Sequence, residues 1–351
     1  MKEKQPIGVK EIARKANVSI ATVDRVLHNR PGVSASTKKK IEGLIKQYNY
    51  QPNILARRLA SKKILRFAAL IPFTSKETDY WLLPLEGIEE AEEMIKPFGV
   101  TIEKYFFDQN KEDTFITQAK KVIKSSPDGI LLAPIFVKES EKIVAKFDQL
   151  KIPYVFINSD IPDLKNLAYC GPNLYSNGYM GAHLVDFFVE DNDTVLIINI
   201  SAQADNLYYL FKKEEGFRDF FEKEGKKINI VKADIKKTDY ISIKKELNAL
   251  FKKHPINVVF VTNSRAFYVA RYFEEAGIKD TMLFGHEFIE KNIHYLENKT
   301  IDFLICQKPK DQAYQGIMAL YNSIVKDEVV EKNNYMSIDI ITKENYKFYK
   351  N

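Results

Sequence analysis

Two short helices joined by a sharp turn are predicted near the start of the chain. Apolar residues recur at the helical period within residues 9–16, and a second such set follows within residues 19–27. Ser19 can cap the second helix, and only a tight turn around Asn17 fits between the two. This spacing is typical of a helix-turn-helix, whose second helix lies in the major groove of DNA. A helical hairpin within an ordinary core is the alternative.

A third helix and a cationic segment complete the N-terminal region. Pro31 and Gly32 predict a turn, Ser34 or Ser36 can cap, and the apolar residues of 41–45 form a helical stripe. We therefore expect an all-α DNA-binding headpiece over residues 1–52. Residues 53–64 have one apolar face and four cationic side chains, which predicts a hinge helix or linker. A helix of this length is too short to be stable in water by itself, so we expect it to fold only when it contacts DNA and the same segment of a second copy of the chain.

From Leu65 onward, short apolar runs of strand length alternate with amphipathic segments of helix length. The strand-like runs are residues 65–73, 102–107, 129–134, 154–158, 194–200, 229–233, 258–262, 281–285 and 301–307. The helix-like segments include residues 85–95, 115–123, 140–150, 179–188 and 211–221. Such alternation predicts parallel sheets covered by helices on both faces.

Nine strands exceed what one open sheet holds comfortably, so residues 65–351 are expected to form an effector-binding domain of two α/β lobes. With a split near Leu167, the first lobe takes about 65–167 and 309–330, and the second takes about 168–305 and 331–351. Ligands of parallel sheets bind outside the carboxyl ends of the strands. Two lobes that face each other therefore predict a cleft.

Positive charge is concentrated in the N-terminal region of the chain. The net charge is +6, yet fifteen Lys or Arg against four acids give residues 1–63 a net charge of +11 and leave −5 for the remainder. A basic N-terminal region followed by a mildly acidic remainder is typical of a polyanion-binding module joined to a part that does not bind the polyanion. The content of 45% hydrophobic and 28% charged residues is that of a soluble globular protein.

Several classes of protein are disfavoured. Cys170 and Cys306 are far apart and lack metal-ligand spacing, which indicates reduced, buried thiols of a cytoplasmic protein. The first residues have no apolar signal core, and no apolar run is long enough to span a membrane. No Gly-rich phosphate loop, nucleophile elbow or metal-ligand cluster is present, so we expect neither an enzyme nor a metal site or cofactor.

The run VKEIARKANVSIATVDRVLHNRPGVS, with YNYQPN and LARRLA after it, resembles the lactose-repressor family of bacterial transcription regulators. The later order of elements resembles the type I periplasmic sugar-binding fold that these repressors carry, closest to ribose-binding proteins. The resemblance is strongest over residues 9–60 and rests on isolated positions beyond them.

The resemblance implies DNA contacts on the second helix and in the hinge. Ile20, Ala21 and Arg25 match base-reading positions, and Arg25 can chelate a guanine edge or, alternatively, clamp a phosphate. Asp24 departs from the family's usual Ser. Its carboxylate would weaken DNA binding near the phosphates unless it pairs with Arg25 or accepts from a cytosine amino group. The full set of implied DNA contacts is Ser19, Ile20, Ala21, Thr22, Arg25, Asn53, Ala56, Arg57 and Leu59. Ala56 and Leu59 match the apolar wedge that kinks the minor groove.

The resemblance also implies an effector site. Tyr80 and Trp81 match aromatics that stack on a sugar, although a pair that plugs the loop is an equal alternative. Asn263, Glu287 and Gln307 follow strands, where the family uses Asn, Asp and Gln for ligand hydroxyls. Lys213 replaces an effector-binding Arg and supplies a point charge without the planar fork. The implied effector contacts are Tyr80, Trp81, Lys213, Asn263, Glu287 and Gln307. His286 and Asp108 lie near the expected cleft.

Together these features predict a repressor-type regulator of carbohydrate-utilisation genes. Its expected partners are a palindromic operator, a small sugar-like effector and a second copy of the chain, with a homodimer or a tetramer both open. A solute-binding protein without a regulatory role, and the same regulator responding to a purine or a sugar phosphate, are the alternatives. Ligand binding could weaken or strengthen DNA binding, because the direction of the effect depends only on which of two lobe arrangements the ligand binds more tightly.

Overall fold

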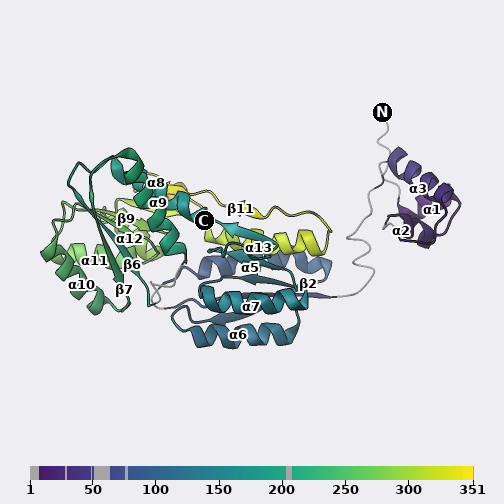
Figure 1. The fold of residues 1–351 in the computed structure, drawn as a ribbon, viewed down its shortest axis with the longest axis horizontal. Helices are drawn as coiled ribbons and strands as arrows, with labels where there is room; N and C mark the ends of the chain where they lie inside the picture. The colour runs from purple at the N-terminus through teal and green to yellow at the C-terminus, as the bar shows by residue number, and fades with distance from the viewer. Residues whose placement is uncertain are drawn as a thin grey trace. The chain divides into compact units, whose positions relative to one another are not determined.

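A computed structural model describes residues 8–27, 30–48, 50, 64–75, 78–202 and 208–350. The chain divides into two compact units, residues 1–63 and 64–351, each of which is considered by itself (Figure 1). None of the described helices is both long enough and apolar enough to cross a membrane.

The N-terminal unit contains three helices, α1 (Val9–Ala16), α2 (Ile20–Leu27) and α3 (Ala35–Gln47). Asn17 ends α1 in the left-handed conformation, with φ 57°, which makes the sharp turn into α2. The Ser19 hydroxyl accepts from the Thr22 amide at 3.2 Å, and Ser34 caps α3 through the Thr37 amide. The core of the unit is built from Ile12, Ala13, Ala16, Val23, Val26 and Ile41. The predicted helix-turn-helix pattern is thus confirmed at the level of its helices.

The first sheet of the larger unit has the strand order β11-β5-β4-β3-β1-β2, and all its pairs are parallel. Its strands are β1 (Leu65–Pro72), β2 (Val100–Phe107), β3 (Gly129–Leu132), β4 (Tyr154–Ile157), β5 (Ala168–Gly171) and β11 (Asn333–Tyr335). Its helices are α5 (Leu82–Ile95), the 3-10 turn η1 (Lys96–Phe98), α6 (Glu112–Ser125), α7 (Val137–Leu150) and α13 (Pro309–Ile324). Helices α5 and α13 pack together on one side, and α6 packs with α7 on the other (Figure 1).

The second sheet has the order β12-β10-β9-β8-β6-β7, with only the β10–β12 pair antiparallel. Its strands are β6 (Thr194–Ile200), β7 (Asn229–Ile235), β8 (Val258–Val261), β9 (Met282–His286), β10 (Phe303–Cys306) and β12 (Asp339–Ile341). Its helices are α8 (Leu174–Asp186), α9 (Tyr208–Glu224), α10 (Tyr240–Lys253), α11 (Ala266–Ala276) and α12 (Glu290–Glu297), and the 3-10 turn η3 (Tyr346–Phe348) follows.

Alternate residues of the second sheet face two separate cores. Leu196 and Ile198 of β6 pack with α10, α11 and α12, whereas Val195 and Ile197 pack with α8 and α9. Both faces are therefore buried, which explains why the strands read as continuous apolar runs. Cys170 and Cys306 are buried and free, as the sequence indicated.

The lobe boundary expected near Leu167 requires a correction. Strand β5 pairs with β4 and β11, so residues 168–171 and 333–335 belong to the first sheet rather than to the second lobe. The chain first reaches the second lobe after Gly171, where it enters α8. The Ala168–Gly171 segment was missed because it is only four residues long and lacks a run of branched apolar side chains. Two later connections also join the lobes, from β10 to α13 and from β11 to β12.

Candidate functional site

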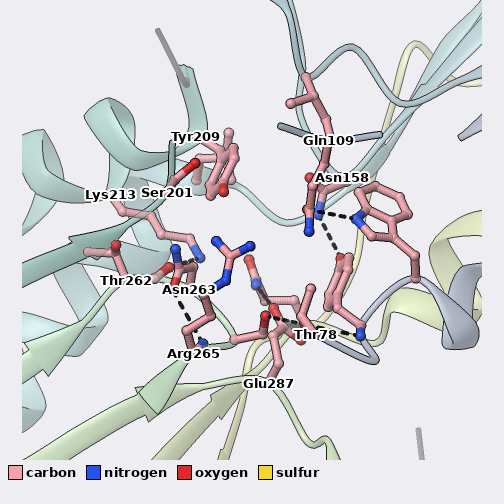
Figure 2. Close-up of a pocket in the computed structure, with 16 residues that line it drawn as sticks. Thr78, Gln109, Asn158, Ser201, Tyr209, Lys213, Thr262, Asn263, Arg265 and Glu287 are labelled. Atoms are coloured by element: carbon pink, nitrogen blue, oxygen red, sulfur yellow. Dashed lines mark hydrogen bonds between the residues drawn. The ribbon is translucent and has the colours of Figure 1, made fainter. Parts of the chain in front are cut away.

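A pocket of about 610 Å³, part of which is open to solvent, lies where the strand ends of the two lobes meet (Figure 2). Its described lining residues are Thr78, Tyr80, Trp81, Gln109, Ile135, Asn158, Leu174, Ser201, Tyr209, Lys213, Thr262, Asn263, Ser264, Arg265, Glu287 and Gln307. Its lining combines aromatic, amide and charged side chains, as small-molecule sites commonly do. The six effector contacts implied by the sequence are all brought together here.

The remaining lining residues were not predicted as ligand contacts, although three of them obey the same rule. Asn158 directly follows β4, Ser201 follows β6, and Thr262 follows β8. Polar residues at the carboxyl ends of parallel strands are the signal that could have found them. Tyr209 lies on α9, where no strand end marks it, and Arg265 lies at the end of the loop between β8 and α11.

The first lobe contributes a wall of aromatic and amide groups. The rings of Tyr80 and Trp81 meet edge to face with their centroids 5.1 Å apart, and both side chains are buried. The Tyr80 hydroxyl accepts from Asn158 Nδ2 at 2.6 Å, and Trp81 Nε1 donates to Gln109 Oε1 at 3.2 Å (Figure 2). Because these bonds fix the rings at the pocket wall, the pair supplies a rigid apolar surface that can stack on a ligand.

The second lobe contributes the charged groups. Lys213 reaches the pocket from α9 and donates to the Thr262 carbonyl at 3.1 Å. Arg265 Nη1 and Asn263 Nδ2 both donate to the Ile200 carbonyl, at 2.5 and 2.8 Å. Two side chains are therefore anchored to the end of β6.

Glu287 is held by an unusual backbone. It has a φ of 75°, in the left-handed region that is costly for a residue with a Cβ. Its amide donates to Ile305, its carbonyl accepts from Asn292 Nδ2, and Gln307 Nε2 donates to its Oε1. The same Asn292 amide group donates to the His286 and Ser264 carbonyls, so one buried side chain fixes the loops that carry Glu287 and Ser264. Strain of this kind is retained where the surrounding structure enforces a functional geometry.

Burial dominates the electrostatics of the pocket. It raises the pKa of Glu287 to about 7, although Lys213 and the Gln307 hydrogen bond oppose the shift. Burial lowers the pKa of Lys213 to about 8, opposed by the Glu287 carboxylate. Glu287 Oε2 is buried and has no hydrogen-bond partner among the described residues. This oxygen is therefore available to accept a hydrogen bond from a ligand.

Replacing Glu287 with Gln is expected to flatten the pH dependence of the free energy of unfolding between about pH 4.5 and 7. The raised pKa means that the folded state keeps a proton which the unfolded state has released. In the wild type, stability from this source is complete below pH 4.5 and is lost as pH rises through 7. Urea unfolding at a series of pH values measures the slope. The exposed control Glu224→Gln should keep the wild-type slope, and a wild-type slope in Glu287→Gln would contradict this origin.

Direct contacts connect the lobes around the pocket. The hydroxyls of Thr78 and Ser264 lie 2.8 Å apart, and Lys291 Nζ lies 3.5 Å from Asp79 Oδ1. Gln312 of α13 accepts from the Asn158 amide, which follows β4 of the first sheet, and donates to the Gln307 carbonyl, which follows β10 of the second. A change in the angle between the lobes would therefore alter contacts at the pocket itself.

Two residues placed near the cleft by the sequence do not line the pocket. The buried His286 ring lies 2.7 Å from the Val261 carbonyl and 2.9 Å from Asn177 Oδ1, so it connects β9 to β8 and α8. Asp108 accepts from the Asn110 amide and stabilises the turn before α6. Both have a structural explanation.

Helix α2 presents an exposed surface that contains the implied base readers. Ile20, Ala21 and Arg25 are exposed, with Ile20 46% accessible although it is a large apolar residue. Asp24 pairs with Arg30 at 3.2 Å, which draws its carboxylate into an intramolecular contact. The implied hinge contacts Asn53, Ala56, Arg57 and Leu59 lie outside the described residues.

Comparisons with known proteins match both parts of the chain. Residues 8–53 match the model for bacterial regulatory proteins of the lacI family, and residues 68–328 match a periplasmic binding protein domain. The chain is 33% identical over 151 residues to catabolite control protein A of Streptococcus mutans, a match that covers 42% of each chain. It is 31% identical over 157 residues to the protein of the same name in Staphylococcus epidermidis, covering 45% of each. The matched part is thus less than half the length of these relatives.

The larger unit has the same fold as several solved structures. A candidate LacI transcriptional regulator from Bacteroides fragilis has a TM-score of 0.77 at 28% identity, covering 82% of this chain and 100% of that one. A solute-binding protein from Burkholderia graminis in complex with D-arabinose has a TM-score of 0.73 at 17% identity, covering 83% and 99%, and shares the fold. The chain therefore belongs to the periplasmic binding protein domain family over residues 68–328, and it carries the DNA-binding segment of the lacI family of bacterial regulatory proteins at residues 8–53.

Proposed function

We propose that this protein is a transcriptional regulator, most simply a repressor of carbohydrate-utilisation genes, that acts in the cytoplasm without enzymatic activity. The observation that carries the proposal is a pocket built by two lobes on a chain that also carries an exposed helix-turn-helix surface. The headpiece of residues 1–52 would bind a palindromic operator as part of a homodimer. Residues 53–64 would form the hinge, and Ser19, Thr22 and the hinge cations would contact phosphates.

A ligand in the pocket would act through its different contacts in two lobe arrangements. Tyr80 and Asn158 belong to the first lobe, whereas Lys213, Asn263 and Glu287 belong to the second. A ligand that touches both walls stabilises the arrangement in which both can be reached at once, and it shifts the population by its differential affinity. That shift would change the spacing of the two hinges in a dimer, and with it the affinity for DNA.

The test is a gel shift with DNA selected from a random pool by the full-length protein. We expect the selected sequences to share a palindrome and to bind more tightly than random DNA at physiological salt. An absence of preference for any palindrome would contradict the proposal. Measuring the melting temperature with sugars, sugar acids and nucleobases then identifies the effector, since a selective ligand raises it by mass action.

Separate substitutions of Asn263 and Glu287 by Ala are expected to abolish the ligand response and leave operator binding intact. Each side chain lines the pocket, and neither belongs to the unit that contains α2. The readouts are the ligand-induced rise in melting temperature and the operator affinity without ligand. Glu290→Ala, an exposed acid at the start of α12, is the control that should retain both. Loss of operator binding by the folded Asn263 or Glu287 variants would count against this assignment.

A sugar-binding protein without a regulatory role is the second candidate, because proteins of that kind share the fold of the larger unit. This candidate predicts ligand binding with no selected DNA sequence. The same pair of experiments therefore separates the two functions.

A further inference from the structure

A second cavity lies beside the connection that leads from the first lobe into α8 of the second. It has a volume of about 500 Å³, part of which is open to solvent. Its described lining residues are Asp160, Tyr169, Pro172, Asn173, Leu174, Tyr175, Tyr208, Lys212 and Tyr335. Leu174 also lines the proposed effector pocket, so the two cavities share part of one wall. The lining is rich in tyrosine, and none of the effector contacts implied by the sequence belongs to it.

Both lobes contribute to the second cavity. Tyr169 of β5 and Tyr335 of β11 belong to the first sheet, and Asp160 lies in the loop after β4. Tyr208 and Lys212 lie on α9, which packs against the second sheet. A ligand in this cavity would therefore contact both lobes at once.

Hydroxyl hydrogen bonds hold two of the tyrosine rings in place. Tyr169 is 2% exposed and its hydroxyl donates to the Pro172 carbonyl at 2.8 Å. Its ring meets that of Tyr335 edge to face, with 6.3 Å between the centroids. The Tyr175 hydroxyl donates to Asp219 Oδ2 at 2.9 Å. The second cavity thus presents preorganised aromatic rings, whose faces carry a negative electrostatic potential.

Asp160 supplies the negative charge of the second cavity. It is the sole acid among the described lining residues, and its Oδ1 accepts from the Ile161 amide at 2.9 Å. Burial raises the pKa of its carboxyl group, opposed by this hydrogen bond and by the charge of Lys332. Lys332 Nζ donates elsewhere, to the Leu164 and Asn166 carbonyls and to Asn166 Oδ1. Over the described ranges of the chain, Asp160 therefore has no ion pair, and a ligand that brings a cation would stabilise it.

The one cation among the described lining residues is already paired. Lys212 Nζ lies 2.6 Å from Glu215 Oε2. It also lies 5.9 Å from the centroid of the Tyr208 ring, within the range at which an aromatic face attracts a cation. Burial raises the pKa of the Tyr208 hydroxyl, Lys212 opposes the shift, and Asp160 adds to it. The Tyr208 ring and the Asp160 carboxylate are therefore close enough to act on one ligand.

We propose that the second cavity binds a small organic ammonium ion, whose charge is held by Asp160 and by the faces of the surrounding tyrosine rings. Aromatic rings grouped with a carboxylate favour such a ligand, because the ring quadrupoles attract the cation and the carboxylate neutralises it. The site is separate from the proposed effector pocket, so the inference goes beyond the proposed function and does not depend on it. Since the ion would touch both lobes, its binding would favour one lobe arrangement.

Titration calorimetry on the full-length protein at pH 7.5 tests the class of ligand with matched pairs. Choline carries a quaternary ammonium group, and 3,3-dimethylbutan-1-ol has nearly the same shape without the charge. Butylamine and butan-1-ol form the corresponding pair for a primary ammonium group. We expect at least one ammonium ion to bind about tenfold or more tightly than its neutral counterpart.

Variants of two lining residues test the placement of the ion. Asp160→Asn removes the charge and keeps the shape, and Tyr208→Leu removes an aromatic face. Each should weaken binding of the ammonium ion about tenfold, whereas Tyr208→Phe keeps the ring and should retain binding. Asp163→Asn is the matched control, because Asp163 is an exposed acid of the same loop and does not line the cavity. If one lining variant fails to fold, the other still carries the test.

Each outcome supports or overturns the proposal. Neutral counterparts that bind as tightly as the ammonium ions, or ammonium ions that do not bind, would overturn the ligand class. Binding that survives both Asp160→Asn and Tyr208→Leu would overturn the placement. Glu287→Ala, which removes the acid of the effector pocket, should leave ammonium binding unchanged, and its loss there would assign the ion to that pocket instead. None of these failures would affect the operator binding that tests the proposed function.

Discussion

Replacement of Arg25 by Ala is expected to abolish selective operator binding at physiological salt. Arg25 lies exposed on α2, and its guanidinium can form two parallel hydrogen bonds to one guanine. Each such contact contributes about 1–3 kcal/mol of discrimination, and a dimer would lose two of them, or about 2–6 kcal/mol. Fluorescence anisotropy with selected operator and with random DNA measures the loss. Binding to random DNA should fall far less.

Two further variants distinguish base reading from phosphate clamping. Arg25→Lys keeps the positive charge but cannot form the bidentate contact, so it should retain affinity for random DNA and lose selectivity. Arg14→Ala is the matched control, because Arg14 is exposed on α1 of the same unit and pairs with Glu11 at 2.6 Å. If Arg25→Lys binds the operator as selectively as the wild type, Arg25 is a phosphate contact and the base-reading role is wrong.

Gly178→Ala is expected to destabilise the larger unit and to impair ligand binding. A Cβ at this position in α8 would lie 1.8 Å from the carbonyl oxygen of Lys213 in α9. Because the obstacle is backbone, no change of rotamer can relieve it, and the two helices must separate. Overpacking of this kind costs about 1–3 kcal/mol and occasionally more. The shift would also move Lys213, so ligand affinity should fall together with the urea midpoint.

Ser176→Ala is the control for this experiment. Ser176 lies exposed on the same helix, and its replacement by Ala introduces no buried atoms. Its urea midpoint and ligand affinity should remain close to those of the wild type. A Gly178→Ala variant with unchanged stability would show that α8 and α9 can separate freely, which would contradict the close helix contact.

The sequence predicted most of the fold because hydrophobic periodicity reports burial directly. All nine expected strands of the larger unit were confirmed, since most of them are apolar runs whose residues are buried on both faces of a sheet. Strands β11 and β12 were missed because each has only three residues, which is too short to give a hydrophobic pattern, and lies at the edge of its sheet. Strand pairing, rather than local pattern, assigns such segments to a lobe.

The pocket was predictable where a polar residue directly follows a strand. Gln307 comes immediately after β10, and Asn263 is the second residue after β8. The positions of both followed from the topology of parallel sheets. Tyr209 could not be found in this way, because it enters from a helix. The pairing of Asp24 with Arg30 was also inaccessible, since it depends on how the chain turns after α2. The DNA contacts and ligand contacts themselves stay predictions.

The late position of β11 and β12 in the chain has a consequence for biosynthesis. Residues 333–341 provide the outer neighbour of β5 in one sheet and of β10 in the other, so one side of each of these two buried strands stays unpaired until this segment has left the ribosome. Open strand edges are sites of mispairing between nascent chains. Chains that terminate before residue 333 would therefore lose the border strand of both lobes at once, and we expect them to aggregate rather than accumulate as an effector-blind DNA binder.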